Sequence, residues 1–448
     1  MSRHRIVQLG LAAAVFAAVA LGVRQTATLG AKASAPTEAA QNEDIYKELE
    51  LFEHALSIVR SDYVEEPKAK DLIYGALKGM LAVLDPYSQF LDPDSYNELK
   101  VDTEGEFGGL GIEITIRDDL LTIISPIDDT PAFKAGLMAG DRIVKIDGEL
   151  TRGITLLEAV KRLRGKPGTS VALTIFREGD TELKEVTLER AVIMIQSVRE
   201  ASVLEDRIAY IRLSDFREHT TDDLAAAVGR LKEQGMDSVI LDLRNNPGGL
   251  LDVAVSVSEL FLQRNELIVS TKGRLRNQNQ EMRARVTGPV SDLPLVVLIN
   301  EGSASASEIV AGAVQDHHRG IIMGTKSHGK ASVQTIFPLK DGSALRLTTS
   351  AYFTPEGRSI HGQGIVPDVE VPFEKPAEQK AKGPTEEQVF EQLEADADAK
   401  DLADKPSKDL AERKRLDNQL ARAIDLLKGI KVYQAEGRLR AQGRSRIY

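Results

Sequence analysis

The sequence contains no cysteine among its 448 residues. Such a chain forms no disulfide and carries no lipid on a cysteine, and this fits an oxidising or a reducing compartment. It also lacks any cluster of histidine and cysteine with metal-ligand spacing, which argues against a metalloprotease and predicts neither metal nor cofactor. The formal net charge of −11 argues against general nucleic-acid binding.

The length predicts two to four domains, and 42% hydrophobic residues are enough for a core. At the N-terminus, basic residues at positions 3 to 5 precede an apolar run at 9–23. Small-residue cleavage sites follow between Ala31 and Ala35. This pattern is typical of a secretory signal peptide, so we expect residues 1–35 to direct export to the periplasm.

An uncleaved membrane anchor is the alternative for this segment. Ile6 and Val7 extend the apolar run, and the cleavage sites lie far downstream. The run at 9–23 is nevertheless shorter than the roughly 20 residues of a comfortable span, which favours cleavage.

Residues 36–104 predict an N-terminal helical segment. Apolar residues recur at helical spacing around Leu49 and Phe52, and a second apolar run at 72–84 stops at Asp85-Pro86. A proline ends a helix because its ring and missing N–H break the hydrogen-bond ladder.

Residues 105–192 predict a β-rich domain. A glycine-rich stretch at 105–114 runs into a strand, and a helix at 155–163, a turn at 164–168 and a strand at 171–177 follow. The whole order resembles a PDZ domain, a fold that adds an extended peptide to a sheet edge and holds its terminal carboxylate with loop amides.

The resemblance assigns that carboxylate loop to four successive residues: Gly109, Leu110, Gly111 and Ile112. A nucleotide-binding loop is an alternative for a lone glycine-rich stretch, but no Gly-Lys-Ser/Thr follows it. A plain hairpin is the other alternative. We expect binding of protein or peptide C-termini.

Residues 193–374 predict an α/β core. Strands at 208–213, 238–243 and 295–299 are each followed by a glycine- or serine-containing turn and a helix. Such repeated βα units build a mostly parallel sheet. The expected fold class is therefore multidomain α/β, with a βα-repeat core, an inserted β-rich domain and helical terminal segments.

The third unit carries serines at alternate positions, among them Ser305 at a helix start, and a loop with Lys330. A serine hydroxyl becomes a nucleophile when a base takes its proton. Desolvation lowers the pKa of a buried lysine, so a neutral amine serves as that base. A simpler interpretation treats Ser305 as a helix N-cap with Glu308 completing a capping box.

Gln334 lies four residues after Lys330, on the same face of an extended strand. An ideal strand separates the two by roughly 13 Å, so contact between them requires a bulge or a turn.

These motifs resemble the carboxyl-terminal processing proteases, also called tail-specific proteases. Their serine run that opens a helix corresponds to 303–309, and their lysine element corresponds to 329–334. The resemblance implies Ser305 as nucleophile, Lys330 as general base and Gln334 as the residue that orients the lysine. A second family-like motif is the turn at 244–249, from which Gly248 or Gly249 would supply one oxyanion donor and the Ala306 N–H the other.

One residue departs from the family pattern. Ala331 stands where the family usually has glycine, and alanine would displace the lysine if that position needs a positive φ. This departure is the main support for an alternative function, a non-catalytic PDZ scaffold.

A Ser–His enzyme is a second alternative. It would use His317, His318 or His328 with Asp316. Its rate would collapse below a pH of about 6.5, where histidine is protonated.

Residues 375–448 form a charged C-terminal region. Helices are expected at 386–399 and 410–430, with a basic end at 438–448. The alternatives are a flexible tail or solvated helices. The family often assembles through terminal helices, so we expect a homo-oligomer, and an adaptor protein is a further candidate partner.

Overall fold

The computed structural model describes residues 38–117, 119–127, 129–180, 182–374 and 410–444. The chain divides into two compact units, residues 1–80 and 81–448. Of the first unit the structure describes α2 (Glu38–Asp62) and most of α3 (Ala69–Ala82), which are the two helices expected there. The signal or anchor segment at 1–35 and the helix expected at 386–399 lie outside the described residues. Among the helices of the described ranges, none is long and apolar enough to cross a membrane.

A small β-rich domain follows the linking helix α4. Its main sheet has the strand order β3-β4-β5-β7-β8, with β6 beside β5, so β3 is an edge strand of this sheet. The expected helix is α6, which begins one residue later than predicted because Thr155 caps it. The domain is preceded by β1 (Gln89–Leu91), which belongs to a sheet of the α/β core, and by α4 (Pro93–Glu104). Its own elements are β2 (Glu106–Gly109), β3 (Ile112–Arg117), β4 (Leu120–Pro126), α5 (Pro131–Lys134), β5 (Arg142–Ile146), β6 (Glu149–Leu150), α6 (Leu156–Leu163), β7 (Ser170–Phe176), β8 (Lys184–Glu189) and β9 (Ala191–Met194).

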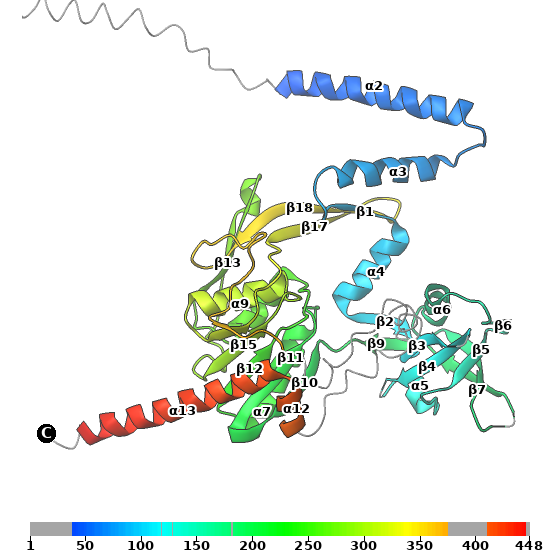
Figure 1. Cartoon of the computed structure of the whole chain (residues 1–448). Coiled ribbons are helices and arrows are strands. Elements are labelled where there is room, and N and C mark those ends of the chain that lie inside the picture. The colour runs from blue at the N-terminus through cyan, green and yellow to red at the C-terminus, as the bar shows by residue number, and fades with distance from the viewer. Residues whose placement is uncertain (1–37, 118, 128, 181, 375–409, 445–448) are drawn as a thin grey trace, which may run out of the picture. The chain divides into compact units, whose positions relative to one another are not determined.

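The α/β core contains two sheets (Figure 1). The first has the order β10-β11-β12-β15-β16-β19 and is parallel except for the β10–β11 pair. The second is antiparallel and joins β1, β18, β13 and β14, with β17 also paired to β18. The mostly parallel sheet predicted from the βα repeats is therefore confirmed. The elements are β10 (Val198–Val203), η1 (Glu205–Arg207), β11 (Ile208–Leu213), α7 (Thr220–Glu233), β12 (Ser238–Asp242), α8 (Leu251–Glu259), β13 (Leu267–Gly273), η2 (Arg276–Gln278), β14 (Gln280–Arg283), β15 (Leu295–Ile299), α9 (Ala306–Asp316), β16 (Ile321–Gly324), β17 (Ser332–Pro338), β18 (Ala344–Phe353), β19 (Val369–Glu370), α12 (Leu410–Leu416) and α13 (Asn418–Arg444).

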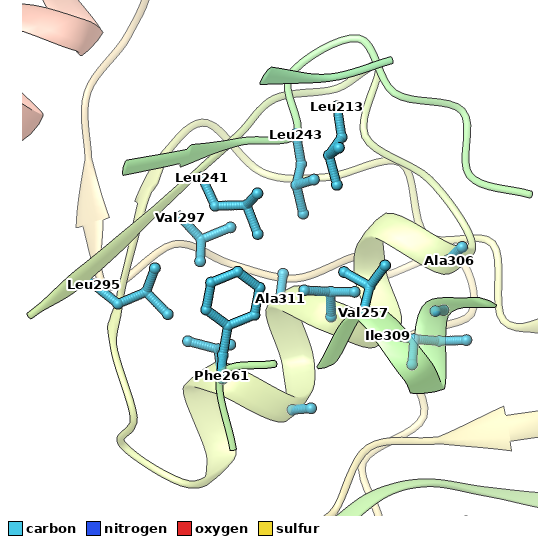
Figure 2. Close-up of a cluster of buried hydrophobic side chains, with 14 of the residues drawn as sticks. Leu213, Leu241, Leu243, Val257, Phe261, Leu295, Val297, Ala306, Ile309 and Ala311 are labelled. Carbon is cyan, nitrogen blue, oxygen red and sulfur yellow. The ribbon is translucent and has the colours of Figure 1, made fainter. Parts of the chain in front are cut away.

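Both faces of the parallel sheet are buried. Alternate strand residues pack against α7, α8 and α9. Figure 2 shows side chains of the sheet, such as Leu241 and Val297, in one cluster with Ile309 of α9 and with Phe261, which follows α8. The intervening residues, such as Tyr210 and Val296, pack against α13. Continuous apolar strands are what burial on two faces requires.

The C-terminal helix α13 is thus the third layer of the core. Its residues Leu420, Ile424 and Leu427 are at most 1% exposed. A helix was expected at 410–430, but neither of the alternatives considered for it, a flexible tail or a solvated helix, describes this packed segment.

A buried ion cluster fixes the start of α13. The Arg244 guanidinium donates to both carboxylate oxygens of Asp417, at 2.9 and 2.7 Å, and also to the buried Asp242. Asp417 in addition accepts from the Leu420 N–H at 2.9 Å and so caps the helix.

We expect Asp417→Asn to lower the free energy of unfolding by about 1.5–3 kcal/mol, the range for a hydrogen bond to a charged group. Asparagine still caps a helix, so the substitution removes the charge and keeps the cap. Urea unfolding followed by circular dichroism measures the change in the free energy of unfolding. The control is Glu281→Gln, which removes an exposed ion pair to Arg283 and costs about 0–1 kcal/mol. Equal effects of the two changes would contradict the prediction.

Candidate active site

Ser305 lies between β15 and α9, in a strained conformation. Its φ and ψ are 55° and −112°, outside the regions that L-residues favour. The Glu308 carboxylate accepts from the Ser305 N–H at 2.8 Å, so Glu308 reaches back to the N-cap residue as the capping-box interpretation expected. Strain of this kind costs about 1–3 kcal/mol and persists only where surrounding contacts enforce it.

The turn at 244–249 packs directly against the serine. The carbonyl of the buried Asn246 accepts from the Ala304 N–H at 3.0 Å and from the Ser307 hydroxyl at 2.9 Å. The Asn246 amide group donates to the Leu213 carbonyl at 3.0 Å. The main-chain carbonyl of Asn246 therefore holds together two loops that are about sixty residues apart in sequence, while the Asn246 side chain ties the turn to the end of β11.

The two glycines of this turn differ in their hydrogen bonds. The Gly248 N–H donates to Asn246 Oδ1 at 2.9 Å. The Gly249 N–H makes no hydrogen bond within the described part of the chain, and neither does the N–H of Ala306 at the first position of α9. Of the expected oxyanion donors, Gly249 and Ala306 are therefore available, whereas the Gly248 amide is already engaged.

Lys330 lies on the loop between β16 and β17. This loop is tied to the serine loop by a hydrogen bond from the His328 N–H to the Ser303 carbonyl at 3.0 Å. Burial is the largest influence on the lysine and lowers its pKa; the Arg346 guanidinium lowers the pKa further, and Glu308 opposes both. The amine can therefore be neutral at a lower pH than an ordinary lysine.

The Lys330 Nζ lies 4.9 Å from the centroid of the Tyr87 ring. In this structure no hydrogen bond joins it to Ser305, and both residues belong to the described part of the chain. Catalytic hydrogen bonds are often long in structures without substrate, so this does not exclude the lysine as a base.

Gln334 lies on β17, next to a bulge. The register against β18 shifts between Val333 and Gln334, which is the irregularity that contact with Lys330 requires. The Gln334 amide group donates to the Ser332 hydroxyl at 2.8 Å, and no hydrogen bond to Lys330 is present between these two described residues.

One cleft of about 510 Å³ joins most of these groups. Ser305, Lys330, Gln334, Gly248 and Gly249 all line it. Its size suits a bound peptide segment, since ligand clefts of about 300–1,000 Å³ are usual. A nucleophile, a base with a lowered pKa and unpaired amides at a helix start are the groups that acyl transfer needs.

The histidines of the Ser–His alternative lie elsewhere. His317, His318 and His328 are not among the cleft-lining residues. The His317 Nε2 contacts the Leu267 carbonyl at 2.7 Å, and Asp316 is hydrogen-bonded to Arg358 and to the Glu356 N–H. This arrangement does not support a Ser–His pair. Within the described ranges there is also no group of three or more potential metal ligands.

The residue that departs from the family pattern is accommodated. Ala331 is buried, 1% exposed, and is not among the described residues with a positive φ. The positive φ of this loop, 93°, belongs to Gly329. Alanine at 331 therefore imposes none of the strain that the sequence left open, and the main support for a non-catalytic scaffold is removed.

The four residues of the expected carboxylate loop lie at one end of the β-rich domain. Gly109 ends β2 and Ile112 begins the edge strand β3. Leu110 is buried, and its carbonyl accepts from the Ala132 N–H at 3.0 Å. Gly111 has φ 75° and approaches Thr130 so closely that a Cβ would lie 2.2 Å from the Thr130 Cβ. An edge strand and a tight loop are the features that peptide addition uses.

Three residues near the dyad were not predicted as part of the site. They are Tyr87, which lies against the Lys330 amine, Tyr352, and Glu308 in any role beyond capping. Glu308 was detectable from its spacing to Ser305. The two tyrosines come from distant segments and leave no local signal.

Family models match most of this architecture. Residues 207–371 match a model described as peptidase family S41, and residues 108–188 match one described as PDZ domain. Residues 9–95 match a model described as the N-terminal domain of the activating protease CtpB.

Curated relatives agree with these matches. The chain is 47% identical over 345 residues to a carboxy-terminal-processing protease of Bartonella bacilliformis, covering 76% of this chain and 78% of that one. It is 40% identical over 320 residues to a carboxyl-terminal-processing protease of Synechocystis, covering 69% and 74%. Among solved structures, the photosystem II D1 C-terminal processing protease matches with 32% identity, a TM-score of 0.42 and coverage of 71% and 86%.

Proposed function

This chain belongs to the carboxyl-terminal processing proteases of peptidase family S41, which are serine-type peptidases, and we propose that it is an endopeptidase with a Ser305–Lys330 dyad. The observation that carries the proposal is the shared cleft, where a strained serine, a half-buried lysine and two unpaired backbone amides line or adjoin one cavity.

The dyad would act as follows. The neutral Lys330 amine takes the proton of the Ser305 hydroxyl as Oγ attacks the scissile carbonyl carbon. The resulting oxyanion accepts from the Ala306 N–H at the start of α9 and from the Gly249 N–H in the turn before α8, while Gly248 allows the close approach. The lysine then gives its proton to the leaving amine, and an acyl-enzyme remains. Lys330 next takes a proton from a water molecule, and this water hydrolyses the acyl-enzyme. Before the first step, the Lys330 side chain turns from Tyr87 toward Ser305, and Gln334 orients it there.

The remaining domains have proposed roles of their own. The domain at 105–192 binds substrate C-termini through the loop from Gly109 to Ile112 and gates the protease core at 193–374. The edge strand β3 supports this role, since its outer edge is not paired with another strand among the described residues.

The terminal segments are the basis for a proposed cellular location and a proposed oligomeric assembly of the protein. We propose that residues 1–35 export the chain to the periplasm, as a cleaved signal or an inner-membrane anchor. A homo-oligomer is supported by the apolar residues Leu49, Phe52 and Val59 of α2, which are 56%, 45% and 41% exposed. An adaptor protein is a candidate partner for the same reason.

Cleavage of an unfolded reporter with an apolar C-terminus tests the activity. Protein lacking residues 1–35 is incubated with the reporter and the products are identified by mass spectrometry, with Ser305→Ala in parallel. Cleavage by the unchanged protein alone supports Ser305 as nucleophile. Equal cleavage by Ser305→Ala would contradict it. Tail-peptide binding without cleavage, also in the presence of a cell extract that supplies an adaptor, would instead support a scaffold.

Tail recognition gives a separate prediction. We expect a tail peptide with a free α-carboxylate to bind the Ser305→Ala protein at least about tenfold more tightly than the same peptide amidated at its end. A hydrogen bond to a charged group contributes about 1.5–3 kcal/mol, which is tenfold or more in affinity. Fluorescence anisotropy with labelled peptides measures the ratio. Equal affinities would show that the loop does not read the carboxylate.

A further inference from the structure

The peptide groups of Ser305 and Lys330 are held by the same two side chains. Glu308 accepts from both N–H groups, and the Tyr352 hydroxyl contacts both carbonyl oxygens. We propose that Glu308 and Tyr352 are positioning residues that set the distance between the nucleophile and the base. The inference deepens the proposed function and rests on the Ser305–Lys330 dyad.

Glu308 is the stronger half of this clamp. Its side chain is fully buried at 0% exposure and accepts four hydrogen bonds. Oε2 accepts from the N–H groups of Ser305 at 2.8 Å and Lys330 at 2.9 Å, and Oε1 accepts from the Ser327 hydroxyl at 2.6 Å and the Gly329 N–H at 2.7 Å. A buried carboxylate is costly unless it is hydrogen-bonded, and these four donors offset the cost of burying Glu308.

Helix capping alone does not account for this arrangement. A capping box needs one contact, from Glu308 back to the Ser305 N–H. The other three donors belong to the lysine loop, about twenty residues further along the chain. Glu308 therefore connects the start of α9 to the loop that carries the base.

Tyr352 closes the opposite side. It lies on β18, is 2% exposed, and its own N–H donates to the Ala331 carbonyl at 3.0 Å. Its hydroxyl lies within hydrogen-bond distance of the Lys330 carbonyl and 3.1 Å from the Ser305 carbonyl. Burial raises the pKa of the Tyr352 hydroxyl well above its ordinary value, so the group keeps its proton and remains a donor.

The clamp matters because the dyad has no other direct connection. No hydrogen bond joins Ser305 to Lys330 within the described residues, and the two belong to different elements. Misplacing a reacting group by about 1 Å can cost roughly 10²-fold in rate. Because Glu308 and Tyr352 hold the peptide groups of both residues, they restrict the backbone position from which the Lys330 side chain turns toward Ser305.

Glu308 also has an electrostatic effect, which gives the test a second readout. The groups that face Lys330 are Arg346, Glu308, the Tyr87 ring and the Tyr352 hydroxyl. Besides Lys330 and Arg346, the charged residues that line the same cleft are Asp102, Asp215 and Arg217. The Glu308 charge raises the pKa of Lys330, whereas burial and the Arg346 charge lower it. Activity needs the neutral amine, so it rises with pH through that pKa, and removal of the Glu308 charge moves this rise to lower pH.

The experiment compares kcat, KM and the pH profile of peptide hydrolysis for the unchanged protein, Tyr352→Phe and Glu308→Gln. Reactive sites are counted by complete titration with a serine-directed fluorophosphonate, so that rates refer to folded enzyme. We expect kcat per site to fall about 10- to 100-fold in both variants. KM should change less than about threefold. Only Glu308→Gln should shift the rise of activity to lower pH.

Glu259→Gln is the matched control. Glu259 is a buried carboxylate of the same core, 7% exposed, which accepts from the Arg285 N–H at 3.0 Å and lies outside the cleft. It should leave kcat per site and the pH profile unchanged. A loss of stability alone would lower the number of titrated sites without moving the pH profile.

Each result decides the inference. Unchanged kcat per site in Tyr352→Phe would overturn the clamp, and this variant decides alone if Glu308→Gln does not fold. Equal losses of kcat in Glu259→Gln and Glu308→Gln would also overturn it. Lys330→Ala separates the two levels: if it stays active, the dyad itself fails, whereas an inactive Lys330→Ala with fully active clamp variants leaves the dyad intact and removes only the clamp.

Discussion

Lys330→Ala is expected to lower the rate of peptide-bond hydrolysis by about 10²- to 10⁴-fold or more, the contribution of a general base. Lys330 is the cleft-lining residue whose pKa burial lowers, and no histidine lines that cleft. The protein should remain folded, because Lys330 makes no side-chain hydrogen bond among the described residues. Single-turnover hydrolysis of a labelled peptide measures the rate, and thermal unfolding confirms the fold.

Two further lysine variants show whether Lys330 acts as a base or as a charge. Lys330→Arg keeps the positive charge, but a guanidinium stays protonated, so it should be as inactive as alanine. Lys326→Ala removes an exposed lysine from the same loop and should have no effect. A Lys330→Arg variant with most of its activity would show that the group supplies charge alone.

The Ser–His alternative has its own variant. His328→Ala should retain the activity of the unchanged protein, since this side chain is exposed and lies outside the cleft. Loss of activity in His328→Ala, with a rate that collapses below a pH of about 6.5, would favour the histidine mechanism instead.

Gly248→Ala is expected to lower kcat/KM by about 10²- to 10³-fold, the cost of losing an oxyanion donor. Gly248 has φ 98°, and a Cβ there would lie 2.6 Å from the Ala304 carbonyl oxygen and 2.8 Å from both the Ala306 nitrogen and the Ser305 Cβ. These atoms are backbone or belong to the nucleophile, so the turn must move away and take Gly249 with it. The kinetics of a short peptide substrate measure the change.

The control for this variant is a glycine with free space around it. Gly229 lies inside α7, and a Cβ there would meet nothing within 4 Å. Gly229→Ala should keep full activity and stabilise the helix by up to about 1 kcal/mol. If Gly248→Ala were as active as Gly229→Ala, the turn would not contribute to the oxyanion site.

The strands of the core were predictable because burial on both faces makes them continuous apolar runs. The strands expected at 208–213 and 295–299 have those bounds in the structure. Helix ends were less certain: the helix expected at 251–262 ends at Glu259, because periodicity shows a buried face but not where the last hydrogen-bonded turn lies.

The local sequence pattern predicted less of the candidate active site than of the fold. The spacing of Ser305 and Glu308 predicts a cap, and the structure contains that contact. The pattern does not reveal that the same carboxylate also accepts hydrogen bonds from the lysine loop. Two of those donors are backbone amides, which leave no signature in sequence. Tyr352 was not singled out, and its position beside Ser305 and Lys330 depends on how distant strands pack.

The docking of α13 was the largest difference from the sequence interpretation. The resemblance to the family suggested a segment for assembly, whereas in the structure Leu420, Ile424 and Leu427 of α13 pack on the sheet. The ion cluster of Arg244 with Asp417 joins positions 173 apart, a separation that no local pattern reports.

That separation has a consequence for how the chain is made. A ribosome builds Arg244 long before Asp417, so the carboxylate partner and the covering helix are among the last parts to appear. Until then one apolar face of the core sheet is uncovered and the turn that carries Gly248 and Gly249 lacks one of its anchors. We therefore expect a nascent chain to hold all the proposed active-site residues before its core is finished, and to become proteolytically competent only after α13 has docked.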